Sequence, residues 1–204
     1  MSIEAPWLYL ASQSPRRRQL LEQWGLRCEL LLPDPHEDAE GLEVVRPNEA
    51  PASYVKRVTR LKLEQAVLRL QRRGLPDGPV LCADTTVALG RQILGKPESP
   101  EHAAQTLRQL SGRRHQVLTA VALAHQGQIH QTLSRSTVQF APLSEAQIAH
   151  YVASGEPIGK AGAYGIQGLA GLLIARISGS YTGIMGLPAF ESAQLLAAAG
   201  LAIT

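Results

Sequence analysis

The sequence lacks the features that mark several common classes of protein. Its 204 residues contain only two cysteines, Cys28 and Cys82, which lie far apart in apolar runs. Two such cysteines form neither a disulfide framework nor a zinc site, so we expect two buried, reduced thiols. No apolar run is long enough to cross a membrane, and the N-terminus lacks the basic and apolar regions of a secretory signal. We therefore expect a soluble, cytoplasmic protein.

Aromatic residues and excess charge are also scarce. Aromatics make up 4% of the chain, and the net charge is only +3. Proteins that bind nucleic acid usually carry a stronger, clustered excess of basic residues, and single-strand binders need aromatic platforms. The composition therefore favours an anionic small molecule as partner and argues against stable nucleic-acid binding. The cluster Arg16–Arg18 keeps a nucleic-acid module open as an alternative.

The pattern of apolar residues predicts a mixed α/β fold. Predicted strands and helices alternate, but the middle of the chain is rich in hairpins, which argues against a purely parallel sheet. A surface loop is expected over residues 33–48, which are rich in Pro, Asp and Glu. The predicted strands are 7–11, 28–32, 79–83, 85–89, 92–94, 117–124, 129–140 and 172–177, and the predicted helices are 15–24, 51–73, 100–110, 144–154 and 188–199.

The segment Ser12–Arg18 follows the first strand and opens the first helix. Ser14 suits the N-cap, and Pro15 suits the first turn, where its missing N–H costs nothing. Arg16–Arg18 then occupy a helix end that the dipole already makes positive. A bound phosphate would balance that charge. The alternative is a solvated basic turn.

Acidic residues mark a second candidate. Asp84 follows the apolar run Val80–Ala83, and the end of a buried strand is where α/β sheets place ligand groups. Its carboxylate suits a divalent metal or a general base, unless it only closes a turn. Glu37 and Asp38 lie in the acidic loop. They would complete a magnesium site if that loop folds over Asp84, and are otherwise solvated charges.

Lysine is rare, so each one is informative. Lys96 stands between Gly95 and Pro97, a rigid corner, and a compact ammonium suits a phosphate oxygen. Lys62 lies within a predicted helix, and the alternative for it is a stem that follows the helix flank. Lys160 opens a glycine-rich loop over residues 159–171.

That loop carries side chains suited to a base. Its glycines permit close approach of the backbone to a ligand, Tyr164 offers an aromatic face, and Gln167 offers both a donor and an acceptor. Residues 178–181 are expected to form a glycine-centred turn, and the alternative is that its hydroxyls also contact a phosphate. His115 is interpreted as a structural residue. No serine or cysteine nucleophile with a plausible base is evident, so covalent catalysis is disfavoured.

Taken together, several motifs resemble those of the Maf-type nucleotide pyrophosphatases. They occur in the family's order, at compatible spacing, over almost the whole chain. The motifs are Ala11–Arg17, Ala83–Thr85, Gly95–Pro97, Ser111–Gly112, His115 with Val117 and Thr119, Lys160–Gly168 and Gly186–Pro188.

The resemblance implies a fold and an activity. Residues 1–204 are expected to form a single catalytic domain, an elongated mixed β-sheet flanked by helices, with two lobes around a central cleft, as in inosine triphosphatase-like proteins. Such enzymes hydrolyse nucleoside triphosphates to the monophosphate and pyrophosphate with a divalent cation, Mg²⁺ or Mn²⁺, and commonly form homodimers. The form of Tyr164–Gly168 resembles the branch that acts on dTTP and UTP. A nucleotide sensor that regulates a partner, for example in cell division, is the alternative.

The resemblance also implies roles for individual residues. It assigns catalysis to Asp84 as proton acceptor with Glu37, Lys62 and Lys96, and the metal to Asp84 and Glu37. It assigns substrate binding and specificity to Ser12, Arg16, Arg17, Thr85 and Gln167, with Arg16 also neutralising the triphosphate. Two positions depart from the family pattern: Gly159 replaces an Asp, and Gly183 replaces an Asn.

Overall fold

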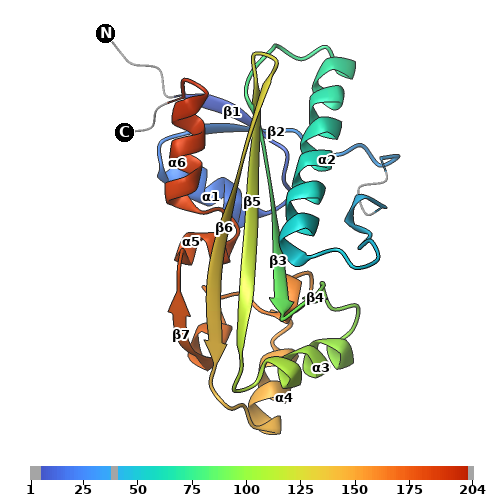
Figure 1. The fold of residues 1–204 in the computed structure, drawn as a ribbon, viewed down its shortest axis with the longest axis vertical. Helices are drawn as coiled ribbons and strands as arrows, with labels where there is room; N and C mark the ends of the chain where they lie inside the picture. The colour runs from blue at the N-terminus through green and yellow to red at the C-terminus, as the bar shows by residue number, and fades with distance from the viewer. Residues whose placement is uncertain (1–5, 38–40, 202–204) are drawn as a thin grey trace.

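The computed structural model describes residues 6–37 and 41–201, which form an elongated α/β molecule around one long sheet (Figure 1). The strands are β1 (Trp7–Leu10), β2 (Arg27–Leu30), β3 (Val80–Leu89), β4 (Gln92–Leu94), β5 (Arg114–His125), β6 (Gln128–Phe140) and β7 (Ile174–Ser178). The helices are α1 (Pro15–Gln23), α2 (Pro51–Arg72), α3 (Pro100–Leu110), α4 (Glu145–Ala153), α5 (Tyr181–Met185) and α6 (Ala189–Ala198). Short 3₁₀ turns lie at Gly41–Glu43, Ala161–Ala163 and Leu169–Leu173. None of the helices in the described ranges is both long and apolar enough to cross a bilayer.

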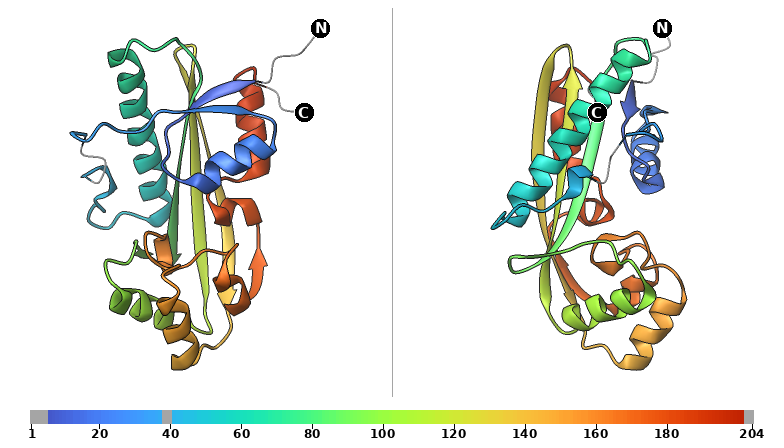
Figure 2. Two further views of the ribbon diagram at one scale, coloured as in Figure 1. Left: turned by 180° about the vertical axis from the view of Figure 1, so that it is seen from behind. Right: turned by 90° about the vertical axis from the view of Figure 1, so that its right-hand side faces the viewer.

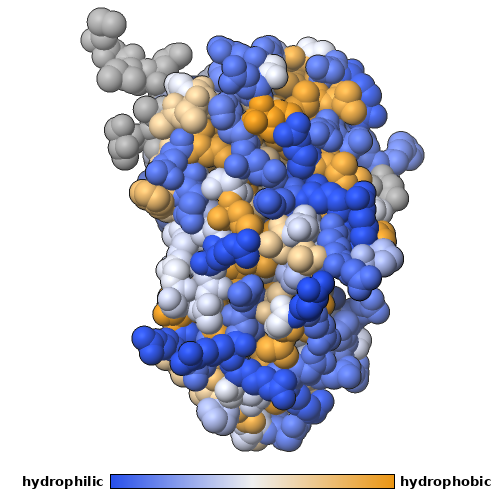
Figure 3. All heavy atoms as spheres, in the orientation of Figure 1, coloured by the Kyte–Doolittle hydropathy of each residue, from blue (hydrophilic) through white to orange (hydrophobic). Residues whose placement is uncertain are grey.

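The sheet is mixed, as the sequence predicts. Its order is β2-β1-β3-β5-β6-β7, with β4 pairing β3 beyond the end of β1. The β1 strand runs parallel to β2 and β3, and the other pairs are antiparallel. Hydrophilic residues predominate on the face shown in Figure 3, with hydrophobic ones scattered among them.

Helices cover the sheet differently at its two ends. At one end, α2 packs on one face, while α1 and α6 pack against the other (Figure 2). At the opposite end, α3 and α4 lie with the two 3₁₀ turns of the glycine-rich loop over a separate core. The predicted pair of lobes is therefore present, and β3, β5 and β6 run through both.

Alternation along β3 decides which way its side chains point. Val80 and Cys82 belong to the core beneath α2, whereas Leu81 and Ala83 belong to the core beneath α1 and α6. Successive residues of a strand face opposite sides. Asp84 therefore points to the α2 face, where it bonds Lys62.

One edge of β3 is only partly covered. The β1 strand pairs with it at Val80 and Leu81, and the Ala11 N–H makes a last bond to the Leu81 carbonyl. The β4 strand pairs with it only over 87–89. Within the described part of the chain, residues 82–86 have no strand partner on this edge, and Asp84 lies in that gap.

Several local predictions need correction. The two strands expected at 79–83 and 85–89 are one continuous strand, since Asp84 pairs with Ala120 of β5 as regularly as its neighbours do. The turn expected at 178–181 leads into α5, whose first turn is capped by the Ser180 hydroxyl accepting from the Gly183 N–H. Cys82 is buried as expected, but Cys28 is only partly buried, and both are free.

Candidate active site

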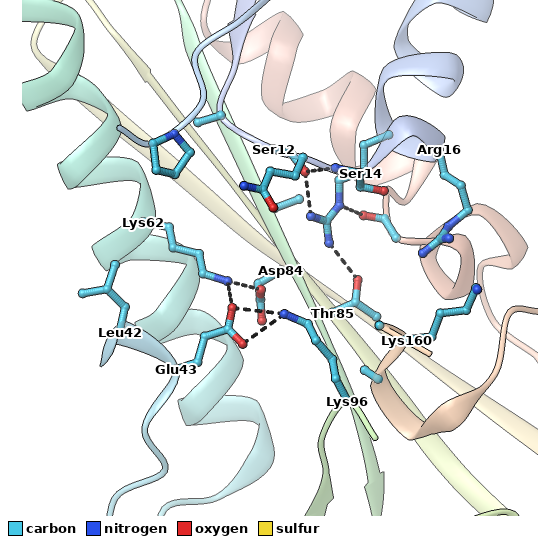
Figure 4. Close-up of a pocket in the computed structure, with 18 of the residues that line it drawn as sticks. Ser12, Ser14, Arg16, Leu42, Glu43, Lys62, Asp84, Thr85, Lys96 and Lys160 are labelled. Carbon is cyan, nitrogen blue, oxygen red and sulfur yellow. Dashed lines mark hydrogen bonds and ion pairs between the residues drawn. The ribbon is translucent and has the colours of Figure 1, made fainter. Parts of the chain in front are cut away.

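A cavity of about 1240 Å³ opens at the uncovered edge of β3 (Figure 4). Segments far apart in sequence form its wall: the turn after β1, the loop before α2, α2 itself, β3, the corner after β4, the glycine-rich loop and α5. Eight of the nine site residues predicted from the sequence lie in its lining: Ser12, Arg16, Arg17, Glu37, Lys62, Asp84, Thr85 and Lys96. Gln167 is not among the lining residues.

Lys62 links two carboxylates at one side of the cavity. Its Nζ donates to Asp84 Oδ1 and to Glu43 Oε1, each at 2.7 Å. Burial works to lower the pKa of Lys62, but the two carboxylates outweigh burial and raise it. The sequence predicts this lysine in the site, and the structure shows why it lies there: α2 packs over the face of β3 that carries Asp84.

Glu43 joins this cluster to Lys96. The Lys96 Nζ lies 3.3 Å from Glu43 Oε2 and 3.5 Å from Oε1. Burial favours the protonated acid, but Lys62 and Lys96 together lower the pKa of Glu43. Two carboxylates and two ammonium groups thus meet at one place.

Glu37 does not join Asp84, which corrects the sequence prediction. Its carboxylate accepts from Arg69 Nε at 2.9 Å and from Arg72 Nη2 at 2.7 Å. The hydrogen bond from Arg69 lowers the pKa of Glu37 to about 2. Glu43 takes the place that the sequence prediction gives to Glu37. Asp38, the other predicted acid, lies outside the described residues.

No local pattern distinguishes Glu43 from the other acids of its loop. Its place is set by the 3₁₀ turn Gly41–Glu43 and by Tyr54 of α2, whose hydroxyl donates to the Glu43 carbonyl at 2.9 Å. That contact is visible only after α2 is placed against the loop.

Arg17 organises the opposite side of the site. Its guanidinium donates to Ser12 Oγ at 3.0 Å, to Thr85 Oγ1 at 3.2 Å and to the Gly186 carbonyl at 2.8 Å. Burial lowers the pKa of Arg17, and nearby Asp84 opposes that effect. The guanidinium N–H groups of Arg17 are thus bonded to other parts of the chain. Arg17 therefore holds the turn after β1 against β3 and the end of α5.

The other two arginines of the cluster behave differently. Arg16 Nε donates to the Met185 carbonyl at 3.3 Å, and its side chain lies at the cavity (Figure 4). Arg18 is exposed and pairs with Glu22 at 2.6 Å, outside the cavity lining. Ser14 is at the N-cap but makes no side-chain cap, and its N–H bonds Ser12 Oγ at 3.2 Å instead. Only part of the basic cluster thus faces the site.

Arg16 and Lys160 form a cationic rim, on the far side of Thr85 from Lys62 and Asp84 (Figure 4). Lys160 donates to the Glu156 carbonyl. Burial lowers the pKa of Lys160, and the positive charge of Arg16 lowers it further. Two cations held this close favour an electron-rich ligand atom, whether a phosphate or a carbonyl oxygen.

Part of the glycine-rich loop packs inside the protein, whereas the sequence predicts that it contacts a ligand base. Tyr164 is 6% exposed and bonds His115 Nε2 through its hydroxyl at 2.8 Å, so its ring offers no open stacking face. A Cβ added at Gly162 would lie 2.7 Å from Val87, which shows that this glycine packs against β3. Gln167 is exposed and is not among the residues that line the cavity.

The donor set suits a hard divalent cation. Asp84 and Glu43 bond the same ammonium, so their carboxylates lie close together beside the cavity. Mg²⁺ and Mn²⁺ prefer oxygen ligands, and Mg²⁺ is commonly held by one or two carboxylates together with substrate phosphates and water. No cluster of three or more His, Cys, Asp or Glu suited to a metal occurs in the described ranges.

Comparison with known proteins decides the family. Residues 7–199 match the family model described as Maf-like protein. The chain belongs to the Maf family. A relative from Albidiferax ferrireducens, named dTTP/UTP pyrophosphatase, is 60% identical over 197 residues, which cover 97% of this chain and 98% of the relative. A protein of the same name from Polaromonas sp. is 60% identical over 199 residues, covering 98% of each chain.

Among solved structures, the Staphylococcus aureus Ham1 protein is 14% identical and covers 66% of this Maf-family chain and 72% of its own, with a TM-score of 0.43.

Proposed function

We propose that this Maf-family chain hydrolyses dTTP and UTP to the nucleoside monophosphate and pyrophosphate, as a cytoplasmic homodimer. The observation that carries the proposal is the cluster of Asp84, Glu43, Lys62 and Lys96 at the open edge of β3, in a cavity of about 1240 Å³. The choice of dTTP and UTP rests on the names of relatives that match at 55–60% identity over nearly the full length.

Asp84 is suited to act as the general base. Its carboxylate accepts a proton from a water molecule, whose oxygen attacks the α-phosphorus. The bond between that phosphorus and the bridging oxygen breaks, and pyrophosphate leaves with the bonding electrons. Lys62 orients Asp84, while Lys62 and Lys96 place positive charge where the transferring and leaving phosphates become more negative.

Two carboxylates of the cluster would hold a divalent cation. We propose Asp84 and Glu43 as its ligands, in place of the pair Asp84 and Glu37 inferred from the sequence. When bound, Mg²⁺ or Mn²⁺ would supply Lewis-acid polarisation of the phosphate oxygens.

The nucleoside is assigned to the other side of the cavity. Thr85 and Arg16 face it there, and Arg17 holds Ser12 and Thr85 in place. Gln167 stays a predicted specificity residue, and its amide lies beside Gly165, near the side chain of Lys160.

A panel of nucleotides tests this function. We expect pyrophosphate release from dTTP and UTP with Mg²⁺ or Mn²⁺, much less from CTP, GTP and dATP, and none with EDTA. Release of orthophosphate would show a different scissile bond, and saturable binding without turnover would favour the nucleotide sensor. Light scattering after size-exclusion chromatography tests the homodimer, which should have twice the mass of the 22.0 kDa chain.

A further inference from the structure

Thr119 lies behind the site, in the middle of β5, and its side chain has one proton to donate. It is 1% exposed and pairs in register with Thr85 of β3. Its Oγ1 lies 2.7 Å from the carbonyl oxygen of Gly183 in α5. A carbonyl oxygen only accepts, so the proton in this bond belongs to Thr119.

This bond fixes the direction of the next one. The hydroxyl oxygens of Thr85 and Thr119 are 3.0 Å apart. Since Thr119 has used its only proton, Thr85 must be the donor. Arg17 Nη2, which can only donate, approaches Thr85 Oγ1 at 3.2 Å. The bonds therefore run one way, from Arg17 through Thr85 and Thr119 to the Gly183 carbonyl.

Thr85 consequently faces the cavity without a free proton. A hydroxyl oxygen accepts two hydrogen bonds, and one of these places is taken by Arg17. The remaining lone pair can accept from a ligand N–H. It cannot serve a phosphate oxygen, which is itself only an acceptor. This polarity places the base, and not the triphosphate, beside Thr85.

Uracil and thymine match this arrangement. Both present an N3–H between two carbonyl oxygens, whereas cytosine presents an N3 lone pair at the same point. Thr85 accepts from the N3–H, and the neighbouring cations Arg16 and Lys160 suit the carbonyl oxygens. With cytosine, the N3 lone pair would face the lone pair of the Thr85 hydroxyl oxygen. A site whose buried polar groups are left unpaired by the wrong base discriminates against that base.

We propose that Thr119 is a positioning residue for base selectivity: it holds the Thr85 hydroxyl as an acceptor and thereby favours uracil and thymine over cytosine. This inference rests on the proposed hydrolysis of dTTP and UTP. Thr119 is buried and is not among the residues that line the cavity, so its role acts only through Thr85.

Thr119→Val tests it, because valine keeps the shape and removes the acceptor for the Thr85 proton. Thr85 can then donate to cytosine N3, and the Gly183 carbonyl still accepts from the Gly186 N–H at 3.0 Å. We expect the ratio of kcat/KM for UTP to that for CTP to fall about tenfold or more, the scale of one discriminating hydrogen bond. Thr119→Ser, which keeps the hydroxyl, should restore the ratio.

Thr106→Val is the matched control, since Thr106 is also buried, at 4% exposure, but lies on α3. It should leave the ratio unchanged. If Thr119→Val does not fold, as judged by circular dichroism, Thr119→Ala removes the same acceptor and should give the same fall. A ratio unchanged in the folded variant, or an equal loss for UTP and CTP, overturns the role of Thr119 while the proposed function stands. Failure of the wild-type protein to release pyrophosphate from UTP or dTTP overturns both.

Discussion

Lys62 shows how much one side chain can decide in this site. Its ammonium stands between Asp84 and Glu43, which would otherwise repel each other at close range. The same ammonium lowers the pKa of Glu43, because a nearby cation favours the charged form of an acid. One residue of α2 thus holds together the two carboxylates that we propose as general base and metal ligands.

Replacing Asp84 with asparagine removes the proposed base and changes the shape little. We expect kcat for pyrophosphate release from UTP to fall by about 10²-fold or more, the range for a positioned acid–base group. Thermal unfolding should confirm that Asp84→Asn is folded. Turnover close to that of the wild-type protein would remove Asp84 from this role.

Glu43→Gln and Glu37→Gln form a matched pair, since both acids come from the same loop. We expect Glu43→Gln to lower kcat about tenfold or more and to raise the Mg²⁺ concentration for half-maximal rate, because a metal ligand is lost. Glu37→Gln should leave that Mg²⁺ concentration unchanged, as its partners are arginines. The reverse result would restore the assignment made from the sequence.

Among the elements, the loop before α2 depends on a set of ion pairs along that helix. Arg69 is 4% exposed, donates to the Leu31 carbonyl at 2.8 Å and also bonds Glu37. Arg73 bonds Asp34 nearby. These contacts fix the first part of the loop that later brings Glu43 to the cavity, so Glu37 acts on the site through position alone.

The pH dependence of stability should reveal this ion pair. The pKa of Glu37 is about 2 in the folded protein against an ordinary value of 4.5, because Arg69 bonds the ionised form. The pair therefore contributes stability above pH 4.5, and that contribution is lost as the pH falls towards 2. We expect Glu37→Gln to lower the free energy of unfolding at neutral pH, and the gap from wild type to narrow below pH 4.5.

Urea unfolding of both proteins at several pH values measures this gap. The comparison also removes the contribution of Glu49, whose pKa Arg57 lowers to about 2, because that pair is present in both proteins. A gap that stays constant down to low pH would mean that Glu37 contributes no pH-dependent stability.

Sequence patterns within a few residues predict most helices and strands. They do not predict side-chain positions that depend on contacts between elements. The helix opened by Ser144 and Gln147 was predictable because its capping box lies within four residues. That Glu43 and not Glu37 lies beside Asp84 is not predictable locally, since both are acids of one loop and only packing against α2 separates them. The open aromatic face predicted for Tyr164 is wrong for the same reason, because its partner His115 lies in a strand distant in sequence.

At the scale of the whole molecule, the two lobes share their longest strands. Val121 and Leu123 of β5 belong to the core beneath α1 and α6, while Val117 of the same strand belongs to the core near α3 and α4. The cavity lies where the lobes meet, so the distance across it depends on both. Because the same strands belong to both cores, a substitution that destabilises one core should also destabilise the other.

The last prediction is that the chain unfolds as one unit, as expected for a single catalytic domain. Both tryptophans lie at one end: Trp7 begins β1, and Trp24 follows α1. Phe140 is fully buried in the core at the other end, and Phe140→Ala should destabilise the protein by about 3–5 kcal/mol. If the lobes unfold together, tryptophan fluorescence and far-ultraviolet circular dichroism should report the same lowered midpoint in urea. A fluorescence transition that stays at the wild-type midpoint while part of the dichroism signal is lost earlier would show two separate units, because the tryptophans would then report a lobe that Phe140 does not stabilise.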